Sequence, residues 1–457
     1  MILMTVVKRV VFGNYSSYLH IFSISFQKHV EKFGLQVYNI TLEIKYQDLF
    51  SPEVKFMKIF VINAGSSSLK FQLIDMNGEV VIAKGTCGRV GAEMGEFEIK
   101  TAKGKFEKEV AMANHTEAFL VVKEALTSGE TKVIDDLSEI GAIGHRVVQG
   151  GAIYKDSTLI TDEVIEGIKS LCDLAPLHNP ANIQGINACM EVFGKDVPEV
   201  AVFDNAFHST MPDEAYMFGI PYEYYEKYQI RRYGFHGTSH KYVSGECAKI
   251  MGKDLKDIKL ITCHLGNGSS ITAIKDGKVI DTSMGLTPLD GFVMGTRSGN
   301  LDPSVVTFIQ EKEGLSAAEI DKVLNKQSGI WGISGGFSDD RDIQREADAG
   351  NARADLARRM QWYQIRKYIG QYIAAMQGVD AIVFTGGIGE NSQALRKNVI
   401  ESFAYLGVTF NEPENAKAIR GVGGELSGAD SKVKIYVIPT NEELMIARDT
   451  KEIVEKA

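Results

Sequence analysis

The fold is decided by the stretch KIFVINAGSSSLKFQLID, residues 58–75 of the chain. Residues 58–63 are a short apolar, β-branched run, which predicts a buried strand. Small residues follow at 64–68, and residues 69–75 then alternate between apolar and polar side chains as a second strand. The stretch therefore predicts a β-hairpin whose tip exposes backbone N–H groups and hydroxyls, with Lys70 just behind it. Such a tip suits a phosphate group, and a plain tight turn is the alternative.

A second copy of this pattern favours the phosphate interpretation. Residues 259–275, KLITCHLGNGSSITAIK, again place a buried strand, a Gly/Ser/Asn tip and an alternating strand before an Asp-Gly turn. A third glycine-rich element, IVFTGGIGEN at 382–391, leads toward a helix that we expect at 392–406, whose N-terminus can hold an anion or a ribose. The internal repeat predicts two similar α/β domains, each with a mixed sheet, facing one nucleotide.

The whole chain has the composition of an ordinary globular protein. It has 457 residues, 44% of them hydrophobic and 24% charged, and a net charge of -9 at pH 7. A general nucleic-acid binder is disfavoured because no net positive field attracts phosphate backbones. No apolar run is long enough to span a bilayer, so we expect no association with a membrane. The five cysteines form no C-x-x-C pair, which indicates reduced thiols in a cytoplasmic enzyme rather than disulfides or a zinc site.

Several common site motifs are missing from the sequence. It has no G-x-x-x-x-G-K-[ST], no G-x-G-x-x-G after a first strand, and neither an H-R-D nor a D-F-G motif. P-loop, dinucleotide-binding and protein-kinase folds are therefore disfavoured. His236 and His240 have the spacing of two metal ligands on a helix, but no third ligand accompanies them, so a structural zinc site is disfavoured as well.

The first 56 residues differ from the rest of the chain. They contain no alanine and ten aromatic residues, and their six Lys/Arg and four Asp/Glu give a net charge of +2. Their apolar stretch is interrupted by polar residues and has no small-residue cleavage site, which disfavours a signal peptide. We expect residues 1–56 to be an extension without a catalytic role, translated from upstream sequence, with Met57 as the natural start; a strand-forming extension is the alternative.

The two hairpins stand among motifs that resemble those of the acetate kinase family, a part of the sugar-kinase, heat-shock-protein and actin superfamily. The likeness covers residues 57–457 in the family's order and none of residues 1–56. Besides the two hairpin tips and the glycine-rich loop at 386–391, the matching motifs are HRVV at 145–148, APLHNP at 175–180, VFDNAFH at 202–208, YGFHGTSH at 233–240, MGTRSG at 294–299 and PTNEE at 439–443.

The resemblance implies a fold and a reaction. The fold is α/β, with two duplicated ribonuclease H-like (actin-like ATPase) domains and a nucleotide cleft between them. We expect the first domain at 57–204, joined by a C-terminal helix at 442–457, and the second at 205–441. The reaction is the reversible transfer of the ATP γ-phosphoryl group to acetate, which gives acetyl phosphate and ADP. We expect direct in-line transfer because no residue is placed as an activated nucleophile.

The resemblance also assigns residues to this transfer, which depends on alignment and charge neutralisation more than on covalent help. Arg146 would bind the acetate carboxylate, and the catalytic residues would be Asp204, His236 and Arg297. Acetate is already ionised at pH 7, so we expect Asp204 to orient an arginine or a Mg²⁺-bound water rather than to remove a proton. The methyl group would meet a small apolar set, namely Val148, Leu177, Phe235 and Pro288. One methylene changes such discrimination by only about 1–3 kcal/mol, so propionate is expected to be a poorer substrate.

ATP and Mg²⁺ take a further set of residues by the same resemblance. Asn63 and Glu442 would hold Mg²⁺, or Mn²⁺ in its place, beside the β- and γ-phosphates. Lys70 would neutralise phosphate charge. The remaining residues expected to bind ATP are His264, Leu265, Gly266, Asn267 and Gly268 around the phosphates, and Asp339, Asp340, Arg341, Gly387, Ile388, Gly389, Glu390 and Asn391 around the adenosine.

Three positions depart from the family's usual residues. Asp340 stands where an apolar residue is common, which affects the contact with the adenine base. Gln149 and Asn300 stand where His and Asp are frequent. Gln149 and Asn300 touch no residue assigned to the chemistry, so these two departures concern details and not the class of reaction.

Other readings stay open. A nucleotide-dependent filament or chaperone shares the hairpins but does not need Arg146, Arg297 and His236 beside a small apolar pocket. A propionate or other short-chain fatty acid kinase shares the chemistry. The helix expected at 354–377 carries an aromatic stripe, which indicates core or a subunit contact. The reaction of the family implies ATP and acetate as the ligands. The family is homodimeric, so we expect a homodimer as the assembly.

Overall fold

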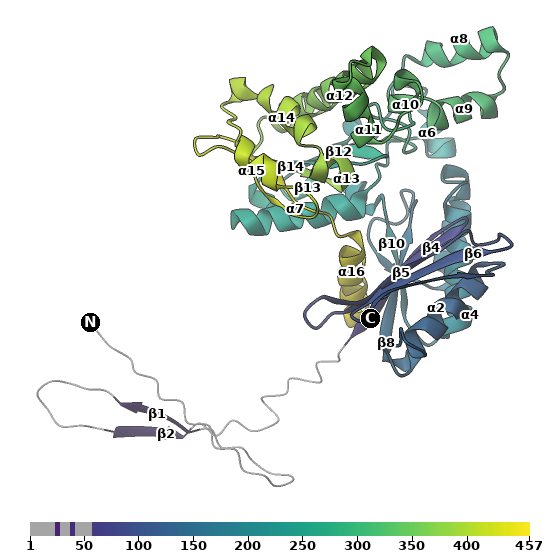
Figure 1. Ribbon diagram of the computed structural model, residues 1–457, viewed down its shortest axis with the longest axis vertical. Helices are drawn as coiled ribbons and strands as arrows, with labels where there is room; N and C mark the ends of the chain where they lie inside the picture. Colours follow the sequence, from purple (N-terminus) through teal and green to yellow (C-terminus); the bar gives the residue numbers. More distant parts are fainter. Residues whose placement is uncertain (1–22, 28–36, 42–56) are drawn as a thin grey trace, which may run out of the picture. The chain divides into compact units, whose positions relative to one another are not determined.

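The computed structural model describes residues 23–27, 37–41 and 57–457. The chain divides into two compact units, with the boundary between residues 56 and 57. In the first unit, strand β1 (Ser23–Gln27) pairs antiparallel with β2 (Val37–Thr41). The rest of the expectation about residues 1–56 lies outside the described residues. The second unit contains two β-sheets and the helices that pack on them (Figure 1).

The first sheet has eight strands in the order β7-β6-β5-β4-β3-β8-β10-β9. Strands β3 and β8 pair in parallel, and β10 continues the parallel part beside β8. This mixture of parallel and antiparallel strands matches the mixed sheet expected from the sequence. The strands are β3 (Lys58–Gly65), β4 (Ser68–Asp75), β5 (Val80–Gly88), β6 (Gly95–Thr101), β7 (Gly104–Val110), β8 (Ile140–Val147), β9 (Thr158–Leu159) and β10 (Glu199–Phe203).

Helices cover both faces of this sheet because the side chains of β3 alternate between them. Phe60 and Ile62 pack in a core with α2 (His115–Thr127) and α4 (Asn179–Phe193). Ile59 and Val61 point to the other face, where the C-terminal helix α16 (Glu442–Lys456) packs on β3, β8 and β10. The last helix of the chain thus belongs to the core of the first sheet.

The second sheet repeats the arrangement with six strands in the order β13-β12-β11-β14-β16-β15. Helices α12 (Ala352–Met376) and α14 (Gln393–Glu401) pack on the face that Ile261 and Cys263 present, and α7 (Gly237–Met251) packs on the face of Leu260. The strands are β11 (Leu260–Leu265), β12 (Ser269–Lys275), β13 (Lys278–Thr282), β14 (Ala381–Thr385), β15 (Gly424–Glu425) and β16 (Lys434–Val437).

The remaining helices fill the connections between strands. The helix expected at 354–377 is observed as α12 (Ala352–Met376). The others are α3 (Asp162–Ser170), α5 (Asp213–Tyr216), α6 (Glu223–Tyr228), α7 (Gly237–Met251), α8 (Pro303–Glu313), α9 (Ala317–Lys326), α10 (Gly329–Ser334), α11 (Asp340–Asp348), α13 (Gly386–Asn391), α14 (Gln393–Glu401) and α15 (Glu412–Lys417).

The structure confirms both hairpins. In the first, Asn63 lies opposite Lys70, and Gly65 lies opposite Ser68 at the tip. In the second, His264 lies opposite Ser270, and Leu265 opposite Ser269. In each hairpin the short apolar run forms the first strand, as predicted, so the repeat in the sequence is also a repeat in the backbone.

Two local expectations differ from the structure. The glycine-rich loop is itself a short helix, α13, so the helix expected at 392–406 is shorter and ends at Glu401. The Gly/Glu-rich composition of residues 411–431 is typical of a surface loop, but the segment contains α15 and strand β15, which pairs with β16. Its Leu426 is fully buried, which explains why a Gly/Glu-rich stretch is ordered against the second sheet.

Candidate active site

The predicted catalytic residues meet where the first sheet ends and helix α7 begins. Asp204 follows β10 directly, and its carboxylate Oδ2 accepts hydrogen bonds from Arg146 Nη2 at 2.8 Å and from the backbone N–H of His236 at 3.1 Å. The Asp204 side chain is 2% exposed. The nearby Asp204 charge raises the pKa of the Arg146 guanidinium. Asp204 therefore orients the guanidinium of Arg146.

His236 is held in an uncommon backbone conformation. It precedes the first residue of α7 with φ of 58°, in the left-handed region that non-glycine residues seldom adopt. Such strain persists only where the surroundings impose it, and it concentrates at functional sites. The ring of His236 stacks on the ring of His264 with 4.2 Å between centroids. Burial lowers the pKa of His236 well below its usual value, and the pKa of His264 to about 4, so both imidazoles are neutral at pH 7.

Arg297 lies over the tip of the second hairpin. A Cβ atom added to Gly268 would stand 2.9 Å from Arg297 Nη1 and 3.6 Å from His236 Nε2. Arg297 Nη1 also donates to the carbonyl of Pro288 at 3.3 Å. The bare backbone of Gly268 thus lets the guanidinium and the imidazole approach the same point, where two donors can act on one anion.

His178 directly precedes α4 and lies within electrostatic reach of Arg146 and Arg297. Burial lowers the pKa of His178, and the positive charges of Arg146 and Arg297 lower it further. Arg146 and Arg297 therefore lie within electrostatic reach of the neutral imidazoles of His178 and His236. Positive charge and N–H donors at fixed positions are what a transferred phosphoryl group requires.

The apolar residues expected around a methyl group are only partly brought together. Val148 and Phe235 are buried in one small cluster. Two methionines that the sequence did not single out, Met284 and Met294, complete this cluster. Leu177 lies apart from it and is 74% exposed.

The two residues expected to hold Mg²⁺ lie next to charged partners. Glu442 begins α16, and burial raises its pKa to about 7, with Arg146 and Lys70 acting in the opposite direction. Asn63 pairs across the first hairpin with Lys70. Among the described residues, Asp204 Oδ1 is buried without a hydrogen-bond partner. A carboxylate oxygen without a partner, near a second carboxylate, fits a hard divalent cation that binds oxygen ligands.

The residues expected to bind adenosine lie at the start of α11 and in α13. Asp339 caps α11 and binds Arg341 through two hydrogen bonds of 2.9 and 2.7 Å. Burial raises the pKa of Asp340, and a hydrogen bond with Ser392 opposes that shift, so α11 meets the segment that follows α13.

Two side chains of α13 are engaged by the protein itself. Glu390 Oε1 accepts from the backbone N–H of Gly386 at 2.9 Å and of Thr440 at 3.1 Å. Asn391 Nδ2 donates to the carbonyl of Gly387 at 2.8 Å. These two side chains hold the shape of the loop. Gly386 and Gly389 are buried, so the exposed surface of α13 consists mainly of Gly387 and Asn391, with Ile388 and Glu390 half-buried.

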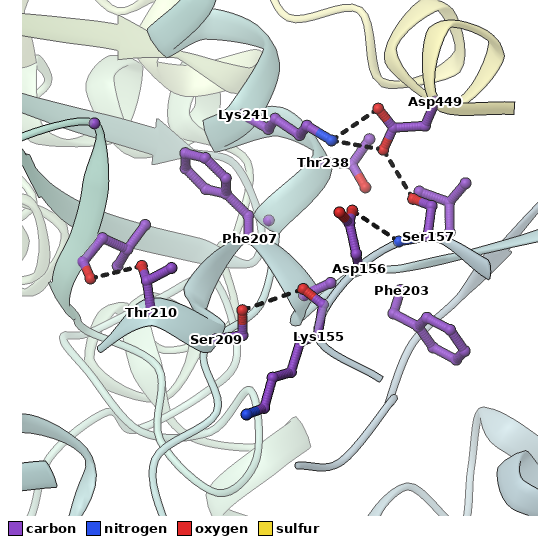
Figure 2. Close-up of a pocket in the computed structure, with 15 residues that line it drawn as sticks. Lys155, Asp156, Ser157, Phe203, Phe207, Ser209, Thr210, Thr238, Lys241 and Asp449 are labelled. Carbon is purple, nitrogen blue, oxygen red and sulfur yellow. Dashed lines mark hydrogen bonds and ion pairs between the residues drawn. The ribbon is translucent and has the colours of Figure 1, made fainter. Parts of the chain in front are cut away.

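A cavity of about 210 Å³ is lined in part by the first turns of α7 and by Asp449 of α16 (Figure 2). None of the predicted site residues lines this cavity. On its wall, Lys241 Nζ donates to both carboxylate oxygens of Asp449 at 2.8 Å, and Ser157 Oγ donates to Asp449 Oδ2 at 2.9 Å. These bonds connect α7 to α16 and to the loop before β9. The cavity is a feature of the junction between the two sheets and not of the predicted site.

Within the described part of the chain, no helix is both long enough and apolar enough to cross a membrane.

Comparisons with known proteins agree on one family. The family model for the acetokinase family matches residues 58–448. An acetate kinase of Carboxydothermus hydrogenoformans is 55% identical over 399 residues, which are 87% of this chain and 99% of the relative.

Solved structures give the same result. The crystal structure of Porphyromonas gingivalis acetate kinase superposes with a TM-score of 0.84 at 44% identity, covering 87% of this chain and 100% of that one. A propionate kinase from Francisella tularensis superposes with a TM-score of 0.80 at 43% identity, again over 87% of this chain and 100% of that one.

The fold and the cluster of arginines and imidazoles define a phosphotransferase built from two duplicated actin-like ATPase domains. Its class is the one in which a carboxyl group accepts the phosphoryl group. The chain belongs to the acetokinase family, which confirms the resemblance seen in its motifs.

Proposed function

We propose that this protein catalyses the reversible transfer of the γ-phosphoryl group of ATP to acetate, giving acetyl phosphate and ADP by direct in-line transfer. The observation that carries the proposal is the convergence of Arg297 Nη1 and His236 Nε2 on the bare backbone of Gly268. Two donors at one point, beside the Arg146–Asp204 ion pair, suit a phosphoryl group during its transfer between two oxygens.

The acetate carboxylate is the ligand that we assign to Arg146. The pair of Arg146 with Asp204 fixes the guanidinium while its Nε remains without a partner among the described residues. A planar guanidinium binds a carboxylate with two parallel hydrogen bonds, which sets the direction of the attacking oxygen. The methyl group would then meet the cluster of Val148, Phe235, Met284 and Met294.

The nucleotide is assigned to the two hairpin tips and to α13. Lys70 and the backbone from His264 to Gly268 would take the phosphates, and Gly387 to Gly389 with α11 would take the adenosine. Asn63 and Glu442, with Asp204 nearby, would hold Mg²⁺, which supplies neutralisation of charge on the phosphate oxygens. His236 and Arg297 would donate to the transferred group as its charge spreads.

A second substrate, propionate, is favoured by one observation. The superposed propionate kinase from Francisella tularensis covers the same part of the chain at a similar identity. The apolar cluster contains two methionines, whose flexible side chains adapt to one more methylene. We expect propionate to be used more slowly than acetate.

One assay tests both substrates. Purified protein is mixed with ATP, Mg²⁺ and acetate, propionate or butyrate, and hydroxylamine traps any acyl phosphate. The proposal expects hydroxamate from acetate, less from propionate and least from butyrate. No hydroxamate from any of the three acids would overturn it.

We also propose an assembly and a location. A homodimer is supported by exposed aromatic side chains such as Tyr363, which is 59% exposed on α12, and light scattering of the purified protein tests it. A cytoplasmic location is supported by five free cysteines, four of them buried, and cell fractionation tests it.

The domain boundaries are part of the same proposal. We place the first domain at 57–204 with 442–457, and the second at 205–441, because each range supplies one sheet with its covering helices. We assign no catalytic role to residues 1–56. A chain that begins at Met57 should show the same kcat and KM values as the full chain.

A further inference from the structure

A chain of hydrogen bonds leads from the interior of the second sheet to His236. Thr262 Oγ1 on β11 lies 2.7 Å from His240 Nδ1, and His240 Nε2 lies 2.7 Å from Ser270 Oγ on β12. Ser270 Oγ then lies 2.9 Å from His236 Nδ1. Thr262, His240 and Ser270 are all fully buried. The chain therefore runs from a dry interior to the one histidine whose other nitrogen, Nε2, faces Gly268 and Arg297.

Such a chain has only two arrangements of its protons when both imidazoles are neutral. A neutral imidazole has one N–H donor and one acceptor nitrogen, and a hydroxyl has one proton. If the Ser270 hydroxyl donates its hydrogen bond to His236 Nδ1, then His240 Nε2 donates to Ser270 Oγ and His236 carries its own proton on Nε2. If the Ser270 hydroxyl instead donates to His240 Nε2, the donor and acceptor exchange roles in every hydrogen bond of the chain, and His236 Nε2 is left as an acceptor.

Thr262 decides between the two arrangements. Within the described part of the chain, His240 Nδ1 is the hydrogen-bond partner of the Thr262 hydroxyl. In the first arrangement the hydroxyl donates to this nitrogen, and every proton of the chain has an acceptor. In the second arrangement the hydroxyl accepts instead, and its own proton is buried without a partner, which is costly. The first arrangement is therefore the stable one.

Burial supports the neutral state that this reasoning requires. It lowers the pKa of both His236 and His240 well below the usual value, with neighbouring histidines as the next cause. The groups that face these two rings are His208, His264, Arg146 and Arg297, of which the arginines are permanently charged.

We propose that Thr262, His240 and Ser270 are positioning residues that keep His236 in the tautomer with its proton on Nε2, so that it donates a hydrogen bond to the transferred phosphoryl group. The inference rests on the proposed function, since it explains how the imidazole in that role acquires its donor. No proton moves along the chain during the reaction; the chain fixes which nitrogen of His236 carries the proton.

The sheet offers a matched control. Thr272 lies directly opposite Thr262 in the β11–β12 register, is also fully buried, and also bonds a histidine, His208 Nε2, at 3.1 Å. The Thr272 hydroxyl is not part of the chain to His236. Thr262→Val and Thr272→Val thus remove the same group from paired positions of one sheet.

The first test observes the tautomer directly. Nuclear magnetic resonance of the protein with ¹⁵N-labelled histidine distinguishes a protonated nitrogen from an unprotonated one in each ring. The inference expects His236 and His240 of the unmodified protein to be protonated on Nε2 alone. It expects Thr262→Val to add a population of His236 protonated on Nδ1, while Thr262→Ser and Thr272→Val keep the original signal. His236 protonated on Nδ1 in the unmodified protein would overturn the inference.

The second test is kinetic. Removing one donor from an oxyanion site costs roughly a hundredfold or more in kcat. Since Thr262→Val only weakens the choice between two tautomers, we expect a smaller loss of about tenfold in kcat, with the KM values for ATP and acetate unchanged. We expect Thr262→Ser to restore the rate, Thr272→Val to retain it, and Ser270→Ala, which breaks the chain next to His236, to reduce kcat at least as far as Thr262→Val.

The outcomes separate this inference from the proposed function. If the unmodified protein forms no acyl phosphate, the proposed function fails, whereas the tautomer is still measured by the first test. If the unmodified protein is active and Thr262→Val and Ser270→Ala retain its kcat, the inference fails and the proposed function stands. A loss of rate in Thr272→Val equal to that in Thr262→Val also contradicts the inference, because it indicates general damage to the sheet.

Discussion

The two hairpins share a backbone and differ in what their strands carry. Behind the tip of the first, β4 presents the exposed cation Lys70. At the matching place in the second, β12 presents the buried hydroxyl of Ser270, which holds His236 and His240. One hairpin therefore brings charge to the site directly, and the other fixes the position and proton of neutral imidazoles. A repeated backbone device can thus serve two purposes within one site.

The tips are also braced differently. In the first hairpin, the carbonyl of Ala64 accepts from Asn182 Nδ2 on α4 at 2.8 Å, and the carbonyl of Gly65 lies 2.8 Å from His115 Nε2 on α2. In the second, the carbonyl of Asn267 accepts from the backbone N–H of Gly295 at 3.0 Å, in the loop that carries Arg297. The first tip is fixed by helices of its own sheet, whereas the second is fixed to the loop that carries Arg297.

The largest effect is expected at that loop. Arg297→Ala should lower kcat by about a thousandfold, the smaller end of what an arginine on a transferred phosphoryl contributes. The KM values for ATP and acetate should change little, because the interaction belongs to the transition state. Steady-state kinetics with the hydroxamate assay measures both. Arg297→Lys should recover part of the rate, and wild-type kcat in Arg297→Ala would remove Arg297 from the catalytic residues.

The next effect compares the two tips at one position. Gly268→Ala places a methyl group 2.9 Å from Arg297 Nη1, which must displace the guanidinium. A displacement of about 1 Å costs about a hundredfold in rate, and that is the loss of kcat expected. Ser67→Ala, at the corresponding place of the first tip, removes one exposed hydroxyl and leaves the backbone of the tip in place, so the loss of kcat should be smaller than in Gly268→Ala. Equal rates in the two variants would show that the second tip does not set the position of Arg297.

A third prediction concerns the bracing of the first tip. Asn182→Ala leaves the carbonyl of Ala64 and the N–H of Val148 without their partner in a buried place. We expect the free energy of unfolding to fall by about 2 kcal/mol. Denaturant unfolding measures it. Asn187→Ala, at an exposed position of the same helix, is the control and should change stability little; the same loss in both variants would contradict a specific role for Asn182.

The smallest effect is expected at Lys70. Lys70→Ala removes one charge from an exposed site, so the KM for ATP should rise by about tenfold, as the loss of one charged hydrogen bond implies. The KM for acetate should not change. Lys84→Ala, which removes an exposed lysine from the neighbouring strand β5, should leave both constants unchanged. If the KM for ATP does not move in Lys70→Ala, the first hairpin does not contribute charge to nucleotide binding.

Much of this comparison was predictable from the sequence because it depends on local patterns. A short apolar run, a tip of small residues and an alternating strand define a hairpin within one stretch of chain, and both hairpins are observed where they were expected. The pairing of Arg146 with Asp204 follows from strands that run parallel and end together, since β8 and β10 are neighbours in that direction.

Other parts depend on contacts between distant segments, which the sequence does not reveal. Ser270 reads as one polar residue of an alternating strand, and only the packing of α7 on β11 and β12 turns it into a bridge between two histidines. Met284 and Met294 are ten residues apart with no motif to link them. One signal in the sequence could have indicated the bridge. His236 and His240 are four residues apart, about one helical turn, and this spacing fits a shared hydrogen-bond partner such as Ser270 as readily as it fits a shared metal ion.

Gly237 illustrates how little room the junction leaves. A Cβ atom added to this residue would stand 2.3 Å from the carbonyl oxygen of Asp204, which accepts the backbone N–H of Gly237 at 2.7 Å. Any larger residue would push the start of α7 away from Asp204, and His236 with it. Distant proteins that keep this junction must therefore keep glycine after the histidine, so a His-Gly pair at the start of a helix is a marker by which the same junction can be recognised in sequences whose other motifs have diverged.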